Sequence, residues 1–309
     1  EYEICNPRGC DPGGRQEDGY RVLKGENMGE EYTIRRMRRD EVNLALDWAA
    51  AEGWNPGLND AECFYSADPQ GFFIGLLDDE PVGCVSAVAY GSSFGFLGLY
   101  IVRQEFRGRG FGIRLWRRGM DYLEGRNVGL DGVIEQQENY KKSGFELIHR
   151  NVRYQGTATG DGTLRPEIVP LSKVPIDDLL RYDGLHFPDQ RFQFLEKWVS
   201  QPDSIAFGFM ADGGLSGYGL LRKCRLGFKI GPLFARDETI AESLFSALVG
   251  GINEGEPVFL DVPEPNSAAL TLAERHSMKK VFETARMYTK GDPGLPMSKI
   301  FGVTTFELG

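Results

Sequence analysis

The chain has 309 residues, of which 41% are hydrophobic and 26% are charged, so it can bury the core of one large or two ordinary domains. No stretch approaches the roughly 18 consecutive apolar residues of a membrane-spanning helix, and the N-terminus lacks a signal-peptide pattern. The net charge of −10 argues against nucleic-acid binding and suits a cationic acceptor such as an amine. Five scattered cysteines without a Cys-x-x-Cys pair argue against a disulfide framework and a zinc site, and predict a reducing, cytoplasmic location.

The first predicted elements follow a polar leader. Residues 1–31 show no hydrophobic period and are interpreted as an N-terminal arm. Residues 32–37 alternate as a strand, and Asp40 is predicted to cap the helix that follows. A short helix near residues 60–66 comes next. Two strands then form a hairpin, over residues 71–77 and 81–90. The apolar face of the first helix is predicted to be Val42, Ala45, Leu46 and Ala49.

The most informative stretch is a strand, a glycine turn and a helix. Residues 94–102 are too apolar and aromatic for a loop and predict a buried strand. Gly108, Gly110 and Gly112 then let the backbone turn sharply and expose its N–H groups. The following helix presents its positive dipole end to this turn, which favours an anion such as pyrophosphate. Its buried face is predicted to be Ile113, Trp116, Met120 and Leu123.

The charge and spacing of this turn restrict the ligand. Residues 103–118 carry six arginines and one glutamate, a local charge of +5 in an acidic chain. The turn lacks the Lys-Ser/Thr pair of a P-loop, and its last glycine has the wrong spacing for a Rossmann turn. A purely structural glycine turn without a ligand is the alternative.

The pattern Arg107-x-x-Gly110-x-Gly112 after a long apolar strand resembles motif A of the GNAT acetyltransferase superfamily. The resemblance implies an α/β fold with a central mixed sheet and a site for acetyl-CoA, with no metal. Tyr140-x-x-Ser143-Gly144-Phe145 resembles the end of the same domain, so the resemblance covers residues 32–155. The cofactor-binding residues that it implies are Tyr100, Ile101, Val102, Arg107, Gly108, Arg109, Gly110, Phe111, Gly112 and Asn139. The family carries an asparagine where this chain has Val133, and Gln136, Gln137 or Asn139 is the candidate substitute.

The rest of the chain repeats this outline at an offset of about 132 residues. A linker over residues 156–165 leads to residues 166–309, where strand, helix and strand patterns recur at 225–235, 238–250 and 258–262. In place of the glycine turn the copy has Ala235-Arg236-Asp237-Glu238, whose carboxylates would repel a phosphate. The arrangement resembles tandem GNAT proteins with an active first domain and a degenerate second one. Residues 299–309 resemble the end of that accessory domain and are predicted either to wall the acceptor cleft or only to bury an apolar surface.

Acyl transfer to an amine needs an acid for the thiolate and a base for the amine. By its position in the family pattern Tyr140 is the predicted acid, since a phenol stays protonated at pH 7; a tyrosine packed for structure alone is the alternative. The position of a family carboxylate aligns with Phe94, which cannot take a proton. Asp131 and Glu135 are therefore the local candidates for the base. The alternatives are that a chain of water molecules takes the proton, and that these two carboxylates are surface groups without a catalytic role.

Other polar groups give weaker indications. His149, His186 and His276 are too dispersed for a metal site or a triad by spacing alone. Residues 181–191 are rich in polar and aromatic groups and predict either a wall of the acceptor pocket or a capped helix start. The resemblance implies acetyl transfer from acetyl-CoA to a small or peptide amine by direct attack, in a monomer or homodimer without nucleic-acid or membrane partners. The alternative is an acyl-CoA-binding regulatory protein without turnover.

Overall fold

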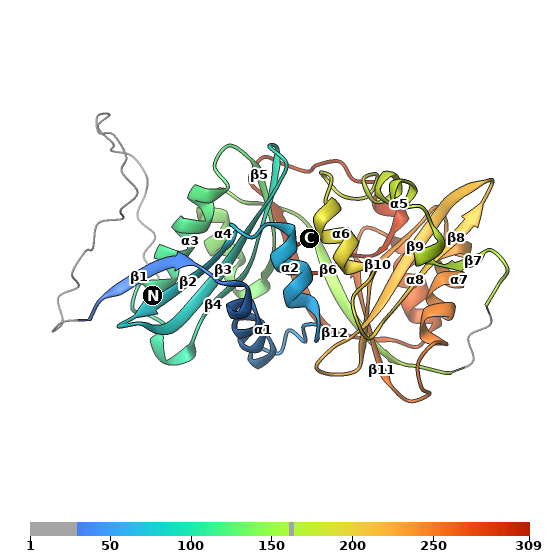
Figure 1. Cartoon of the computed structure of the whole chain (residues 1–309), viewed down its shortest axis with the longest axis horizontal. Helices are drawn as coiled ribbons and strands as arrows, with labels where there is room; N and C mark the ends of the chain where they lie inside the picture. Colours follow the sequence, from blue (N-terminus) through green and yellow to red (C-terminus); the bar gives the residue numbers. More distant parts are fainter. Residues whose placement is uncertain (1–29, 161–163) are drawn as a thin grey trace.

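The computed structural model describes residues 30–160 and 164–309, and the strands of these two segments form one continuous mixed sheet (Figure 1). We term residues 30–160 the first half and residues 164–309 the second half. The strand order along the sheet is β1-β2-β3-β4-β5-β12-β6-β11-β10-β9-β8-β7, and β13 pairs with β10. The predicted mixed α/β architecture is confirmed.

The first half contains the predicted order of one strand, two helices, three strands, helix, strand, helix and strand, and β4 has the predicted bounds. The elements are β1 (Tyr32–Arg36), α1 (Val42–Ala51), α2 (Asp60–Ala67), β2 (Phe72–Leu77), β3 (Glu80–Tyr90), β4 (Phe94–Val102), α3 (Phe111–Tyr122), β5 (Asn127–Val133), α4 (Gln137–Lys142) and β6 (Glu146–Thr157), with 3-10 turns η1 (Arg39–Glu41), η2 (Gln104–Phe106) and η3 (Ile134–Gln136).

The second half repeats this order and adds one short strand at its end. The elements are β7 (Ile168–Pro170), α5 (Ile176–Asp183), α6 (Phe192–Trp198), β8 (Ser204–Ala211), β9 (Gly214–Lys223), β10 (Phe228–Ala235), α7 (Glu238–Val249), β11 (Pro257–Pro263), α8 (Ser267–Arg275), β12 (Lys279–Tyr288) and β13 (Ile300–Gly302), with 3-10 turns η4 (Leu171–Lys173) and η5 (Met297–Lys299). The register repeats too, since β4 pairs in parallel with β5 over residues 94–96 only and β10 with β11 over residues 228–230 only.

The two halves exchange their last strands. β12 of the second half lies between β5 and β6, and β6 of the first half lies between β12 and β11. Figure 1 shows these two strands side by side at the centre of the molecule, near the C-terminus. Each strand completes the sheet of the half to which it does not belong, so the predicted boundary near residue 155 divides the chain but not the sheet.

Helices cover both faces of the first half's sheet. Leu115 and Trp116 of α3 pack with strand residues such as Val85 on one face. Leu46 of α1 and Phe64 of α2 pack on the other face. The predicted face of α1 is confirmed. No helix within the described segments has the length and apolar character needed to cross a membrane.

One local prediction is wrong, and another is right only in part. Asp40 does not cap α1, because it lies inside η1, and the carboxylate of Glu41 instead accepts a hydrogen bond from the Arg38 N–H at 2.7 Å. In α3, Ile113 and Met120 are only partly buried. The buried residues of this helix are Phe111, Leu115, Trp116 and Gly119, and Leu123 just after it is also buried, so the predicted face holds for Trp116 and Leu123.

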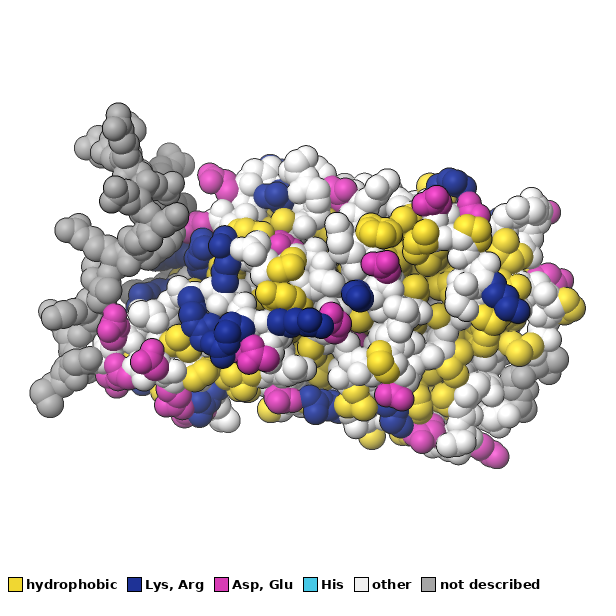
Figure 2. Space-filling view, viewed as in Figure 1, with side chains coloured by type: hydrophobic (Ala, Val, Ile, Leu, Met, Phe, Trp, Pro, Cys, Tyr) yellow, Lys and Arg dark blue, Asp and Glu magenta, His cyan; other side chains and the backbone are white. Residues whose placement is uncertain are grey.

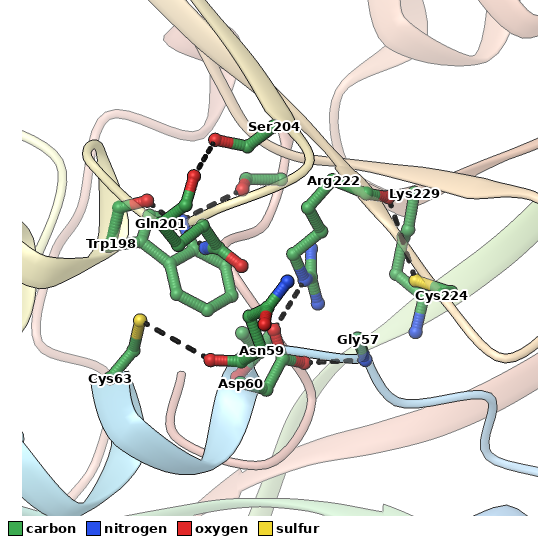
Figure 3. Close-up of polar contacts among 12 residues, drawn as sticks. Gly57, Asn59, Asp60, Cys63, Trp198, Gln201, Ser204, Arg222, Cys224 and Lys229 are labelled. Atoms are coloured by element: carbon green, nitrogen blue, oxygen red, sulfur yellow. Dashed lines mark hydrogen bonds and ion pairs between the residues drawn. The ribbon is translucent and has the colours of Figure 1, made fainter.

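Buried polar contacts also join the halves (Figure 3). Asp60 of α2 and Arg222 of β9 are fully buried, and Oδ1 of the carboxylate accepts from Nε of the guanidinium at 2.9 Å. The second carboxylate oxygen accepts from the Gly57 N–H at 2.7 Å, and the guanidinium lies over the Trp198 ring. Because a buried charge without its partner is costly, these contacts fix α2 against the second half.

Candidate functional site

The glycine turn before α3 offers backbone N–H groups that have no partner among the described residues. Gly108 and Gly110 have φ of 77° and 80°, a left-handed conformation that side chains disfavour, and a Cβ on either would meet open space. Gly110 is the N-cap of α3, and no described side chain caps this helix. The N–H groups of residues 108–110 donate to no other described residue. The residues therefore fit a diphosphate held by backbone amides at a helix N-terminus.

Arginines flank this turn and are held by surface carboxylates. Arg107 donates from Nε to the Val102 carbonyl at 2.8 Å and pairs with Glu52, and Arg109 pairs with Glu30. Exposed ion pairs of this kind contribute little energy, so a phosphate can replace the carboxylate partner. Lys and Arg side chains gather over the first half in the view of Figure 2.

A bulge in β4 lies where the end of this strand parts from β5 and stays paired with β3. Cys84 pairs with Ile101 and Ser86 with Gly98, so two residues of β4 face one of β3, and Leu99 has a φ of 44°. Beyond residue 96, β4 no longer pairs with β5. We term this opening the β4–β5 split. The edge of β4 that carries Tyr100, Ile101 and Val102 borders it.

The third glycine of the turn has a packing role. A Cβ on Gly112 would lie 2.7 Å from the hydroxyl oxygen of Tyr100. The Tyr100 ring also meets Trp116 edge-on, with centroids 5.4 Å apart. Gly112 thus lets the first turn of α3 rest directly on the edge of β4 beside the split.

Tyr140 lies on α4 beside the same split. Its ring stacks on Trp116 with centroids 5.5 Å apart and covers Gly132, where a Cβ would lie 2.2 Å from the ring. Burial raises the pKa of the Tyr140 phenol to about 12. The hydroxyl therefore stays protonated at neutral pH and is available as a proton donor.

The predicted base candidates lie in different surroundings. The carboxylate of Asp131 is fully buried and forms a bidentate ion pair with Arg286 of β12, at 2.6 and 3.0 Å. It also accepts from Asn151 at 2.7 Å and Thr284 at 3.2 Å. These hydrogen bonds occupy the lone pairs of the Asp131 carboxylate, and the pair with Arg286 holds the exchanged strand β12. Glu135 lies exposed on η3.

Asn139 and Phe94 have local packing and hydrogen-bonding partners. The amide of Asn139 donates to Gln136 at 2.7 Å within the start of α4. Phe94 is 3% exposed and packs against Tyr90, Phe187 and Tyr288. The phenyl ring of Phe94 cannot take a proton.

The C-terminal segment of the chain borders the split from the α1 and α2 side. The carbonyl oxygen of Glu307 lies 2.0 Å from the place of a Cβ on Gly98, and the Leu308 carbonyl accepts from the Tyr90 hydroxyl at 3.1 Å. Residues 301–309 are all buried. The segment thus packs on β3 and β4, which fits both sequence expectations, a wall of the acceptor cleft and the burial of an apolar surface.

The corresponding site in the second half is filled by the chain itself. β13 pairs with β10 in the opening that matches the β4–β5 split, and the Val303 N–H donates to the Asp261 carbonyl at 2.9 Å. At the start of α7 the Asp237 carboxylate accepts from the Ile240 N–H at 3.0 Å. The N-terminus of α7 is therefore capped by a carboxylate of the chain, and the edge of β10 is paired with β13.

A cavity lined by residues of both halves includes side chains that the sequence left without a role. Its lining includes His149, His186 and Arg286. Residues 181–191 were one signal for it, and the alternative of a capped helix start is wrong, since α6 begins after Arg191 without a capping side chain. No local sequence pattern indicated that residues so far apart in the chain would line the same cavity.

Comparisons with known proteins agree with this arrangement. The model of the acetyltransferase (GNAT) family matches residues 38–145, and that of the acetyltransferase (GNAT) domain matches residues 179–302. The holothin acyltransferase of Pseudoalteromonas sp. (strain SANK 73390) is 29% identical over 94% of this chain and 98% of its own length. The uncharacterized N-acetyltransferase YitH of Bacillus subtilis is 24% identical, over 75% of this chain and 83% of its own length.

Solved structures share the fold. A putative acetyltransferase from Pyrococcus horikoshii has a TM-score of 0.76 at 23% identity, covering 93% of this chain and 99% of its own. A tandem GNAT protein from the clavulanic acid biosynthesis pathway has a TM-score of 0.58 at 12% identity, covering 85% and 99%. With a family match in each half and a repeated order of elements, the chain belongs to the GNAT acyltransferase superfamily as a tandem protein with two of its domains.

Proposed function

We propose that the first half transfers an acetyl group from acetyl-CoA to a primary amine by direct attack. The observation that carries the proposal is the open glycine turn at the start of α3 beside the β4–β5 split. Residues 107–112 hold the diphosphate through their amides, and the edge of β4 over residues 100–102 supplies N–H groups to the thioester. Tyr140 donates the proton to the leaving thiolate.

The geometry changes which residue we assign to take the proton from the amine. Asp131 is not retained for this role, because Arg286, Asn151 and Thr284 occupy its oxygens. Glu135 keeps a free carboxylate but stands exposed on η3. Asn139 stays a proposed contact at the start of α4.

One acyl-CoA per chain is expected. The second half offers neither glycine amides nor an open strand edge, because Asp237 caps α7 and β13 occupies β10. Calorimetric titration with acetyl-CoA should give a stoichiometry of one. The similarity to a protein named holothin acyltransferase supports acyl transfer as the activity of this chain.

One observation favours a second function, an acyl-CoA-binding regulatory protein. Phe94 occupies the place where some relatives of the resembled family carry a catalytic carboxylate, and it is buried among aromatic rings. Such a protein would bind acetyl-CoA and never release free CoA.

The experiment that separates the two measures free thiol from acetyl-CoA, propionyl-CoA and hexanoyl-CoA. The amines are aniline, benzylamine, spermidine, kanamycin, lysine and a lysine-containing peptide. Transfer to any amine, with the acetylated product seen by mass spectrometry, supports the enzyme. Tight binding of acetyl-CoA without thiol release from any pair overturns it and supports the regulator.

A further inference from the structure

The β4–β5 split is open toward the glycine turn and closed at its other end. It closes where Phe96 of β4 pairs with Gly129 of β5, and the glycine turn lies beyond the opposite end of β4. A donor held by its diphosphate at this turn runs along the edge of β4 toward Phe96. With the thioester at the N–H groups of residues 100–102, the acyl group extends toward Gly98, which lies about 7 Å further along the strand.

The C-terminal main chain covers this closed end on the α1 and α2 side. From the place of a Cβ on Gly98, the carbonyl oxygen, carbonyl carbon and Cα of Glu307 lie 2.0, 2.9 and 3.1 Å away. The place of a Cβ on Gly309 lies 2.9 Å from the Phe96 ring. Residues 307–309 therefore lie directly on β4 between residues 96 and 98, where the acyl group of the donor would end.

Hydrogen bonds hold this segment in place. Oγ1 of Thr305 accepts from the Glu307 N–H at 3.2 Å and from the Leu308 N–H at 2.9 Å. The Leu308 carbonyl oxygen accepts from the Tyr90 hydroxyl at 3.1 Å, and the Leu308 side chain is 1% exposed. Because moving the segment would leave these buried polar groups unsatisfied, it forms a fixed wall.

Apolar side chains close the same end of the split on the α3 side. Leu97 of β4 and Leu130 of β5 are buried in one cluster with Leu115 and Trp116 of α3. Since protein cores are close-packed, a long acyl chain cannot leave the split on this side without displacing the core below α3. The space for the acyl group is thus bounded on both faces of the sheet and at its end.

We propose that residues 307–309 set the donor specificity of the first half and restrict it to short acyl groups such as acetyl and propionyl. This inference rests on the place of the donor in the proposed function. The side chain of Leu308 belongs to the same apolar cluster as Leu99 and Ile101 at the bulge of β4. The cavity that Gly309 also lines has a free volume of about 20 Å³, which holds one water molecule and no longer acyl chain.

The test measures binding, so that it does not depend on turnover. Calorimetric titrations give the Kd for free CoA, acetyl-CoA and hexanoyl-CoA with the wild type, Leu308→Ala and Leu244→Ala. Leu244 of α7 is a matched control, because it is fully buried in a cluster that contains no residue of β4 or β5. Both variants remove the same atoms from a core, and only Leu308→Ala removes them from the proposed wall.

The wild type should bind hexanoyl-CoA at least tenfold more weakly than acetyl-CoA, and Leu308→Ala should bring the two Kd values within threefold. The Kd for free CoA should stay unchanged in Leu308→Ala, which shows that it is folded, and Leu244→Ala should keep the wild-type ratio. Should Leu308→Ala not fold, Leu308→Val should narrow the ratio by a smaller factor.

Equal binding of acetyl-CoA and hexanoyl-CoA by the wild type overturns the inference. An unchanged ratio in the folded Leu308 variant, or an equal change in Leu244→Ala, overturns it too. The expected binding pattern without transfer to any of the six amines supports the wall and overturns the proposed enzyme. If none of the three CoA ligands binds, both the inference and the proposed function fail.

Discussion

A charge placed in the glycine turn should separate acyl-CoA binding from folding. Gly110 has a φ of 80° and open space at its Cβ position, so Gly110→Asp meets no clash and bears only the backbone cost of a left-handed L-residue, about 1–2 kcal/mol. This cost lowers the free energy of unfolding but leaves the bound and free folded states equally strained. It therefore does not change the Kd for acetyl-CoA.

The new carboxylate acts on the ligand instead. A carboxylate about 5 Å from one phosphate charge costs about 1 kcal/mol in water and about 3 kcal/mol at an effective dielectric constant of 20. Two phosphate charges double these values, and each 1.4 kcal/mol is a factor of ten in Kd. We expect Gly110→Asp to weaken acetyl-CoA binding at least tenfold in a calorimetric titration at low salt.

The second half provides a matched control. Gly213, in the β8–β9 turn, has a φ of 78° and equally open space. Gly213→Asp should lower stability by a similar amount and leave the Kd unchanged. An unaltered Kd in Gly110→Asp, or an equal loss in both variants, would refute the placement of the diphosphate at the α3 turn.

Three further outcomes follow from the geometry. Tyr140→Phe keeps the ring and loses the hydroxyl, so kcat should fall about 100-fold with the Kd for acetyl-CoA within threefold; equal kinetics would exclude the proton-donor role. Asp131→Asn leaves the buried guanidinium of Arg286 without its charge partner and should lower the free energy of unfolding by about 3–5 kcal/mol in urea, unlike a surface carboxylate. Because the pKa values of His149 and His186 are lowered in the folded state, the unfolded chain binds protons first as pH falls below about 6.5, so stability should decrease from pH 7 to 5; the double Gln variant should flatten this decrease, and an identical slope would contradict the assignment.

Short-range patterns predicted the part of the site that is local in sequence. β4, the glycine turn and α3 follow one another without a break, and left-handed backbone at Gly108 and Gly110 requires only the residue type. The order of elements in the first half, and the strand, helix and strand of the second half over residues 225–262, followed from hydrophobic periods for the same reason. The face of α3 was predicted in part: Trp116 and Leu123 are buried, whereas Ile113 and Met120 are only partly buried.

Long-range partners could not be predicted. Asp131 is a cleft-edge carboxylate by its position in the chain, yet its partner Arg286 lies 155 residues away on an exchanged strand. A strand shows the same alternation of apolar and polar residues whether it pairs with strands of its own half or of the other half. His186 likewise owes its fixed tautomer to a carbonyl four residues earlier and its place in the cavity to segments from both halves.

The exchange of β6 and β12 makes this chain comparable to a covalent, strand-swapped dimer. A polypeptide that ends after β6 would carry a strand whose two neighbours, β11 and β12, belong to the missing half, and would leave β5 with an unpaired edge. Neither fragment of a chain cleaved between the halves should therefore be stable alone. Mixed together, the two fragments should complement each other and restore the native fold, because each supplies the other's missing neighbours.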